Sequence, residues 1–320
     1  MAGAERADLV GAVLDGRWRL GEPLGTGGTG VVFEATDLDD GAAVVVKTMR
    51  PAFAHDPDLC RRLRREAEVA RTVGHPGIVP VLAEGTLADG SPYVVMQRIV
   101  GESLGRLLLR HGPLEEPVAA LLGMRIASIL HAVHARGYVH RDLKPEHVLV
   151  GIGPQGLLEV YLIDFGVCAA PTAPADERHR ERGRVYGTPT YVSPEQAMGD
   201  PDVDGRADVF GLGVVMFEAL TGRVPFTAPN VASLLRRIIR EDAPRLGLVA
   251  PWISREMDEI VSRCLARVRE QRMPSMRAVA RAMAPLVSDR LEAAARLGRR
   301  LGARAVPYDA MPTPLAEAAA

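Results

Sequence analysis

The spacing of hydrophobic positions divides the 320-residue chain into a strand-rich first part and a helical second part. In the first part, short runs of β-branched and aromatic residues are separated by turn sequences such as Asp39-Asp40-Gly41, a pattern typical of strands. We therefore predict strands at 17–20, 30–36, 42–49 and 93–96. Between the last two strands, apolar residues recur at helical spacing and predict a helix over 58–73.

The second part, from about residue 103 to 287, has the apolar periodicity of helices, strongest at 117–135 and 208–220. Strands followed by helices indicate an α+β protein with two lobes. We place the N-lobe at 18–96, a hinge at 97–101 and the C-lobe at 102–287. Residues 1–17 form an N-terminal extension, and 288–320 are expected to hold a C-terminal helix and a disordered tail.

Charge and cysteine content exclude several classes of function. With 39 basic and 40 acidic residues, the chain lacks the basic excess of a nucleic-acid or membrane-surface binder. Cys60, Cys168 and Cys264 lie too far apart for a metal motif or a disulfide framework, which indicates a reducing compartment. The first residues lack the apolar stretch of a signal peptide, and no uninterrupted apolar run reaches the roughly 18 residues of a membrane span. We therefore expect a cytoplasmic protein that binds neither nucleic acid nor membrane.

A glycine-rich sequence stands between the first two predicted strands. It runs Leu24-Gly25-Thr26-Gly27-Gly28-Thr29-Gly30-Val31-Val32 and contains the pattern G-x-G-x-x-G. Because glycine has no side chain, such a turn can close over phosphate groups and offer them backbone N–H groups. The same pattern opens dinucleotide-binding folds, but there a helix follows it, whereas a strand is predicted here. A flexible hairpin without a ligand is the alternative.

Two charged residues occupy positions where an apolar residue is expected. Lys47 ends the apolar run of the third predicted strand, and Glu66 lies inside the apolar stripe of the predicted helix. A carboxylate that faces a core needs a cationic partner, and Lys47 is the natural candidate. Such a pair would hold the lysine amine toward the phosphates of a nucleotide. A simple charge at a strand edge is the alternative for Lys47.

Two carboxylates follow in the second part, on loops expected to be adjacent. One is in His140-Arg141-Asp142-Leu143-Lys144, and the other is in Asp164-Phe165-Gly166. Phosphoryl transfer needs one carboxylate to orient or deprotonate the acceptor hydroxyl and another to hold Mg²⁺ on the phosphates. Lys144, two residues after Asp142, can neutralise the transferring phosphate.

In this order, the motifs resemble the eukaryotic-type serine/threonine protein kinases of bacteria over residues 18–287. The resemblance implies a two-lobed protein-kinase-like fold and transfer of the γ-phosphoryl group of ATP, with Mg²⁺, to Ser or Thr of a protein substrate. Asp142 is then the catalytic base, Lys144 contacts the γ-phosphate and Asp164 binds the metal. The implied ATP-binding residues are Leu24, Gly25, Thr26, Gly27, Gly28, Thr29, Gly30, Val31, Val32, Lys47, Glu66, Met96, Ile99 and Leu149.

Further residues acquire roles through the same resemblance. Glu195 is expected to pair with Arg272, and Thr188 together with Lys144 favours Ser/Thr over Tyr as the acceptor. Segment 187–195 resembles the peptide-substrate platform of protein kinases, which disfavours a small-molecule kinase. The remaining structural and regulatory residues are His140, Arg141, Phe165, Gly166 and Asp208.

The sequence departs from the family pattern at His147, where the family has a metal-binding asparagine. Imidazole nitrogen is a poor ligand for Mg²⁺ and suits Mn²⁺ better, so Mn²⁺ is a possible cofactor. The alternative to an active enzyme is a pseudokinase, which binds nucleotide or partners with little transfer.

The activation segment also differs from that of kinases that are switched by phosphorylation. Between Gly166 and Gly187 the only Ser or Thr is Thr172, and the stretch 176–184 is charged instead. We therefore expect a carboxylate, Glu181, to pair with Arg141 and hold the loop without phosphorylation. A solvated charged loop is the alternative. Cys168, two residues after Gly166, is interpreted as a quiet, semi-buried thiol rather than a reactive one.

Overall fold

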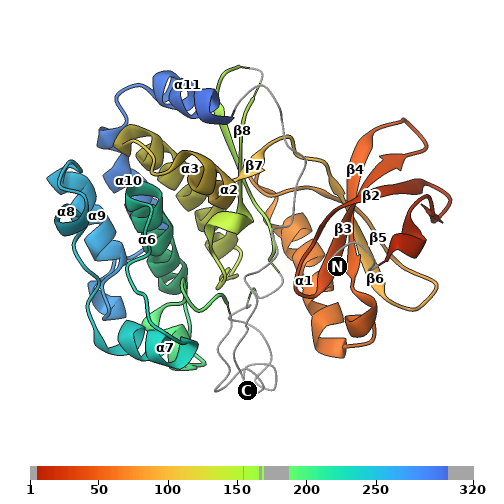
Figure 1. Ribbon diagram of the computed structural model, residues 1–320, viewed down its shortest axis with the longest axis horizontal. Helices are drawn as coiled ribbons and strands as arrows, with labels where there is room; N and C mark the ends of the chain where they lie inside the picture. The colour runs from red at the N-terminus through yellow and green to blue at the C-terminus, as the bar shows by residue number, and fades with distance from the viewer. Residues whose placement is uncertain (1–5, 154, 166–167, 169–186, 302–320) are drawn as a thin grey trace.

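The computed structural model describes residues 6–153, 155–165, 168 and 187–301, and it has two lobes (Figure 1). The smaller lobe contains an antiparallel sheet of six strands in the order β1-β2-β3-β4-β6-β5. Helix α1 (Pro57–Val73) packs against this sheet. The strands are β1 (Val13–Leu14), β2 (Trp18–Thr26), β3 (Gly30–Asp37), β4 (Ala43–Met49), β5 (Val81–Thr86) and β6 (Pro92–Gln97).

The larger lobe is mainly helical and also holds a small sheet in the order β7-β8-β9. Its strands are β7 (Glu102–Ser103), β8 (Val148–Ile152) and β9 (Leu158–Leu162). Its helices are α2 (Leu104–His111), α3 (Glu116–Ala135), α5 (Pro194–Ala197), α6 (Arg206–Thr221), α7 (Val231–Arg240), α8 (Leu246–Val249), α9 (Arg255–Cys264), α10 (Met276–Met283) and α11 (Arg290–Leu301).

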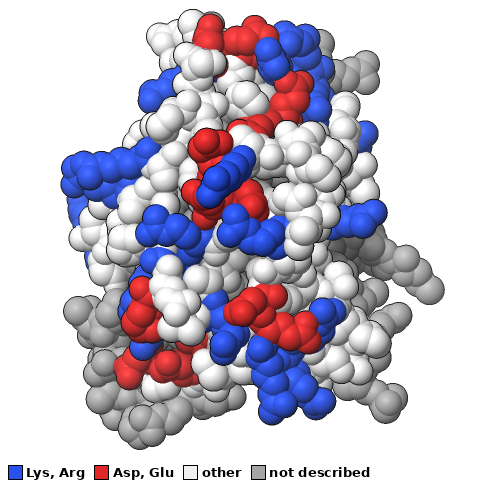
Figure 2. All heavy atoms as spheres, turned by 90° about the vertical axis from the view of Figure 1, so that its left-hand side faces the viewer, with Lys and Arg blue, Asp and Glu red and all other residues white. Residues whose placement is uncertain are grey.

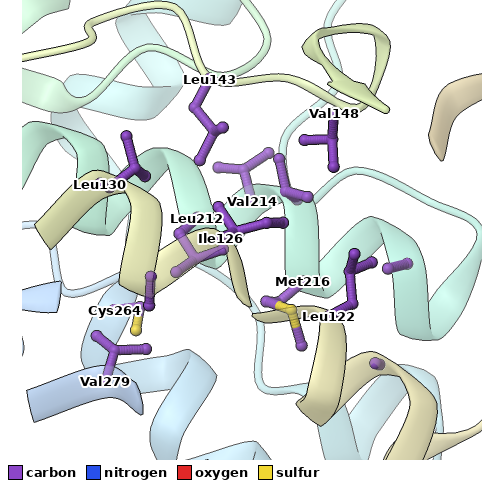
Figure 3. Close-up of a cluster of buried hydrophobic side chains, with 14 of the residues drawn as sticks. Leu122, Ile126, Leu130, Leu143, Val148, Leu212, Val214, Met216, Cys264 and Val279 are labelled. Carbon is purple, nitrogen blue, oxygen red and sulfur yellow. The ribbon is translucent and has the colours of Figure 1, made fainter. Parts of the chain in front are cut away.

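The core of the larger lobe forms around α3 and α6. Figure 3 shows Leu122 and Ile126 of α3 facing Leu212 and Met216 of α6, and all four side chains are buried. By length and composition α3 could cross a membrane, but here most of it is buried among the other elements of this core. On the side of the lobe that carries α8 and α9, acidic and basic side chains intermingle, as the near-zero net charge leads one to expect (Figure 2).

The two-lobed α+β fold predicted from the sequence is confirmed. Several strands differ from the prediction: β2 continues to Thr26, and β1, β5, β7, β8 and β9 were not predicted. Strand β5 lies at the edge of the sheet and alternates half-buried with exposed positions, so it lacks the dense apolar run of a central strand. The connection between the lobes lies between β6 and β7, within the predicted hinge. Helix α11 lies in the region where a C-terminal helix was expected, and residues 302–320 are outside the described part.

The described part of the N-terminal extension packs on the N-lobe. Strand β1 pairs with β2. The buried Arg6 side chain reaches the end of β4 and the turn before β6. Its Nε donates to the carbonyl oxygen of Met49 at 3.1 Å and its Nη2 donates to Ser91 Oγ at 2.9 Å. An ion pair with Asp89 at 2.6 Å completes the contact.

Helix α1 begins and ends where the sequence places the appropriate signals. The Asp56 side chain accepts hydrogen bonds from the first amides of the helix, and Pro57 stands at its first position. Gly74, with φ of 60°, closes the helix in the left-handed conformation that glycine adopts without strain.

A buried ion pair fixes the segment that precedes α6. Arg272 is fully buried and donates to both oxygens of Glu195, at 2.6 and 2.7 Å. The same guanidinium also donates to the carbonyl oxygens of Ala266, Arg206 and Arg267. The contact that the resemblance implies between these two residues is therefore present, with every carboxylate oxygen paired.

Removing one partner of this pair should be costly, because the other charge would remain buried and uncompensated. We expect Arg272→Ala to lower the free energy of unfolding by about 3–5 kcal/mol. The matched control is Arg206→Ala, because its pair with the half-exposed Asp204 should contribute less than about 1 kcal/mol. Urea denaturation of both variants measures the difference, and equal small losses would show that Glu195 tolerates the loss of its partner.

Candidate active site

Lys47 of β4 forms an ion pair with Glu66 of α1, close to Asp164 of the C-lobe. Lys47 Nζ lies 2.7 Å from Glu66 Oε2 and 3.8 Å from Asp164 Oδ1. Burial raises the pKa of Glu66, and the charge of Lys47 offsets this only in part. The contact is the one that the position of Glu66 in an apolar stripe predicts, and it fixes the lysine amine beside Asp164.

The glycine-rich sequence forms the tip of the hairpin between β2 and β3. The amide of Gly27 donates to the carbonyl oxygen of Gly30 at 2.8 Å, which closes the turn. A Cβ atom on Gly30 would lie 2.9 Å from the carbonyl oxygen of Thr48, so a side chain there would push β3 away from β4. A strand follows the glycines, as predicted, and the dinucleotide-binding fold is thereby excluded.

The two valines after the glycine loop face opposite sides of the sheet. Val32 pairs with Lys47 across β3 and β4 and therefore shares its face, on the side where Lys47 approaches Asp164. Val31 belongs instead to the core of the N-lobe, together with Phe33 and Val46. Of these two valines, only Val32 thus has its side chain on the face that carries Lys47.

An apolar group joins the end of β6, the connection between the lobes and the small sheet. Ile99 and Leu149 are buried against Val79, and Met96 packs on them. Tyr161 and Ile163 complete the cluster from the β9 side. Three of the expected ATP-binding residues, Met96, Ile99 and Leu149, are therefore brought together by the tertiary fold.

Asp142 is held by Thr188 through one of its two carboxylate oxygens. Oδ1 accepts the backbone amide of Thr188 at 2.7 Å and its hydroxyl at 3.0 Å. Lys144 Nζ donates to Thr188 Oγ1 at 2.9 Å and lies 3.7 Å from Asp142 Oδ2. Two of the three residues expected at the reaction, Asp142 and Lys144, are thus connected through the third, and Asp142 Oδ2 is the oxygen left to face a substrate.

Asp208, at the start of α6, fixes the loop that carries Asp142. Its carboxylate accepts the backbone amides of His140 and Arg141, both at 2.8 Å, and lies 2.7 Å from His134 Nε2. Burial by itself would raise the pKa of Asp208, but the contacts with His134 and His140 together outweigh it and lower this pKa. Asp208 therefore remains a carboxylate deep in the protein and fixes the loop by its backbone.

Two residues without glycine's freedom adopt left-handed backbone conformations here. Arg141 and Asp164 both have φ of 65°. Such conformations store about 1–3 kcal/mol each and persist only where surrounding contacts impose them. The ring of His140 packs edge-on against Phe165 at 5.0 Å, which ties the two strained loops together.

His147 lies between the carboxylate groups of Asp142 and Asp164. Its Nδ1 is 2.9 Å from the backbone carbonyl oxygen of Asp142, which can only accept, so we assign the proton to Nδ1. Burial lowers the pKa of His147 to about 4, so the ring is neutral at neutral pH. The lone pair of Nε2 then faces Asp164 Oδ2 at 3.5 Å.

This arrangement fits a divalent cation. Desolvation by itself would favour the neutral acid, but the basic neighbours together, Lys47 foremost, outweigh it and lower the pKa of Asp164, which is therefore ionised. An imidazole lone pair and a carboxylate oxygen that face one another are both electron donors, and a cation between them would satisfy both. The described residues contain no group of three or more His, Cys, Asp or Glu ligands, so phosphate oxygens and water would complete the coordination, as is usual for Mg²⁺.

Gln196 was not singled out from the sequence, although it supports the site. It forms a capping box with Ser193 at the start of α5, and its Nε2 donates to the carbonyl oxygen of Arg141 at 2.8 Å. The spacing S-x-x-Q is a recognised signature of a helix start and could have drawn attention to it. His134, which contacts Asp208, carried no such local signal. Gly166, Thr172 and Glu181 lie outside the described residues.

Two lobes, a glycine hairpin over a paired lysine, and a clamped aspartate beside a lysine define a phosphotransferase of the protein kinase type. The chain belongs to the protein kinase family, because residues 18–283 match the model of the protein kinase domain. It is 34% identical over 300 residues to the serine/threonine-protein kinase PknH of Mycobacterium tuberculosis. It is also 36% identical over 257 residues to PknE of Mycobacterium bovis and over 262 residues to PknB of Mycobacterium tuberculosis.

These alignments cover most of this chain and less than half of each relative. They include 93%, 80% and 81% of this chain, and 46%, 44% and 41% of PknH, PknE and PknB respectively. All three relatives are named serine/threonine-protein kinases, so a bacterial serine/threonine protein kinase is the class to which this chain is similar along most of its length.

The three cysteines differ in burial, which predicts different reactivity. Cys168 and Cys264 are buried and their thiol pKa values are raised by burial, that of Cys264 to about 12, so neither forms thiolate at neutral pH. Cys60 is half-buried. We expect iodoacetamide at pH 7.5 to alkylate Cys60 alone in the native protein and all three after denaturation, as measured by peptide mass spectrometry. Labelling of native Cys168 at the rate of Cys60 would contradict its assignment as a quiet thiol.

Proposed function

We propose that this chain transfers the γ-phosphoryl group of ATP to a Ser or Thr hydroxyl of a protein, with Asp142 as the catalytic base. The observation that carries the proposal is the Asp142–Thr188–Lys144 group. One Asp142 oxygen is occupied by two hydrogen bonds from Thr188, which orients the other toward the cleft. A base must be within hydrogen-bond reach of the proton it takes, and fixed orientation is the requirement that this contact meets.

Each charged residue of the cleft has a part in this reaction. Asp142 accepts the proton of the acceptor hydroxyl while the oxygen–phosphorus bond to the acceptor forms and the bond between the γ-phosphorus and the β-phosphate oxygen breaks. Lys144, beside Asp142, stabilises the negative charge on the transferring group. Lys47, fixed by Glu66, binds the α- and β-phosphates. The apolar cluster of Met96, Ile99 and Leu149 encloses the adenine.

Asp164 and His147 would hold the divalent metal. When bound, the metal neutralises phosphate charge and orients the phosphates. The protein contributes an ionised carboxylate and a neutral imidazole whose Nδ1 is engaged by the backbone. Because nitrogen is a softer ligand than the amide oxygen of asparagine, this donor set favours Mn²⁺ over Mg²⁺.

A pseudokinase is the second candidate, and His147 is the specific observation that favours it. The ring is buried against Asp142 and close to Asp164, where the family has an asparagine oxygen donor. A protein that binds nucleotide through Lys47 and the apolar cluster, yet holds only one metal well, would transfer phosphate slowly. The strained but fully supported backbone of Arg141 and Asp164 favours the active enzyme.

Replacing the base should abolish transfer and leave the fold intact. Asparagine can still accept the Thr188 hydrogen bonds through its Oδ1, so we expect Asp142→Asn to retain its unfolding temperature and its affinity for ATP. Phosphate transfer to a protein substrate should fall by about two to four orders of magnitude, because the group that accepts the proton is gone. Incorporation of radiolabelled phosphate measures this loss.

The control for this experiment is Asp204→Asn, which neutralises a carboxylate paired with Arg206 outside the cleft and should transfer phosphate at the parent rate. Equal rates for Asp142→Asn and the parent would exclude Asp142 as the base. Absence of transfer by the parent with either Mg²⁺ or Mn²⁺, with ATP still bound, would establish the pseudokinase.

Metal preference provides a second test. We expect the parent to be more active with Mn²⁺ than with Mg²⁺, and His147→Asn to raise the Mg²⁺-supported rate by about tenfold or more by restoring an oxygen ligand. Initial rates across a titration of each metal, for both proteins, measure the effect. Identical Mg²⁺ titration curves for the two proteins would mean that residue 147 does not coordinate the metal.

A further inference from the structure

Helix α1 belongs to two hydrophobic cores at once. Its first half packs on the N-lobe, where Leu63 and Ala67 contact the group around Met49. Its second half enters the core of the C-lobe through Val69 and Val73, which are 0% and 5% exposed. Glu66 lies between Leu63 and Ala67 and only three residues before Val69, so its distance from Lys47 depends on how the C-lobe holds the end of the helix.

Two polar contacts reinforce that hold, and both come from the short segment between α3 and His140. Tyr138 Oη donates to Glu68 Oε1 at 3.1 Å. Arg136 Nη1 donates to the backbone carbonyl oxygen of Thr72 at 2.6 Å. Residues 136 and 138 thus contact α1 at two points, one helical turn apart.

The Tyr138 ring is well placed to act as an anchor. It is 9% exposed and is part of the C-lobe core, while its hydroxyl reaches out to α1. Burial and the contact with Glu68 raise the pKa of Tyr138, which therefore remains a donor. The segment is continuous with the catalytic loop, whose His140 and Arg141 amides are fixed by Asp208.

A helix transmits a displacement along its axis with little loss, because its backbone hydrogen bonds make it stiff. Glu66 and Glu68 are two residues apart, so a shift that Tyr138 prevents at Glu68 is also prevented at Glu66. The Lys47–Glu66 contact of 2.7 Å would be broken by a displacement of about 1 Å.

We propose that Tyr138 and Arg136 are positioning residues for phosphoryl transfer: their contacts with Glu68 and Thr72 hold α1 where Glu66 orients Lys47. One set of contacts thereby fixes both residues 136–138, which precede the catalytic loop, and α1, which orients Lys47. The kinetic part of this inference rests on the proposed kinase function, whereas the effect on Lys47 and nucleotide binding does not.

Substitutions at this contact separate positioning from packing. Tyr138→Phe keeps the buried ring and removes only the hydroxyl, and Glu68→Ala removes the acceptor. Each variant should bind a fluorescent ATP analogue about fivefold more weakly and show a KM for ATP about fivefold higher. A factor of about five corresponds to the loss of one hydrogen bond of typical net strength. Glu68→Gln keeps an acceptor oxygen and should behave nearly as the parent. The double variant of Tyr138→Phe with Glu68→Ala should be no weaker than either single variant, because both remove the same bond.

The control is Tyr93→Phe, which removes another tyrosine–carboxylate contact, to Asp15, away from the segment before the catalytic loop. It should lower the unfolding temperature without changing nucleotide affinity. Hydrogen exchange should quicken in α1 of Tyr138→Phe and stay unchanged in α1 of Tyr93→Phe.

The outcomes separate this proposal from the proposed function. Unchanged nucleotide affinity and α1 exchange in Tyr138→Phe and Glu68→Ala would overturn it, whatever the unfolding temperatures. So would equal losses in Glu68→Gln and Glu68→Ala, because a lost acceptor could not then be the cause. If the parent transfers no phosphate, the kinase proposal fails, while nucleotide affinity and exchange still decide whether this contact positions α1.

Discussion

Asp208 is the buried charge on which the geometry of the catalytic loop depends. Its carboxylate accepts two consecutive backbone amides, those of His140 and Arg141, and contacts His134. A carboxylate so deep in a protein is stable only when its oxygens are satisfied: Oδ1 accepts the Arg141 amide, and Oδ2 accepts the His140 amide and contacts His134. Because the amides immediately precede Asp142, the position of the proposed base is set by α6, the most buried helix of the C-lobe core.

The same clamp explains why strained backbone is tolerated here. Arg141 adopts a left-handed conformation while its amide is held by Asp208 and its carbonyl oxygen by Gln196. Asp164 adopts the same conformation next to Phe165, which is buried against His140. Neighbouring contacts therefore hold both residues in a conformation that they would not adopt alone. As a result, the carboxylates of Asp142 and Asp164 are held near one another.

Two lysines lie beside the three carboxylates of the site. Lys47 faces Glu66 and Asp164, and Lys144 lies beside Asp142, so each carboxylate has a cation nearby. Burial keeps His147 neutral, which leaves its Nε2 lone pair directed at Asp164. A nucleotide and its metal would enter a site whose charges are already ordered, so little reorganisation is needed when phosphate binds.

The sequence by itself determined the features that depend on local order. The glycine hairpin, the Asp142 and Asp164 motifs and the helix carrying Glu66 could be predicted, because their spacing within one loop or one helix already specifies their geometry. The tertiary structure alone decided which distant groups meet: Thr188 at Asp142, Gln196 at Arg141 and Tyr138 at Glu68, separated by 46, 55 and 70 residues. The tertiary structure also places the Val31 side chain in the N-lobe core and makes α1 contribute side chains to two hydrophobic cores. No local sequence pattern predicts these contacts, because they form only when elements far apart in the sequence pack against one another.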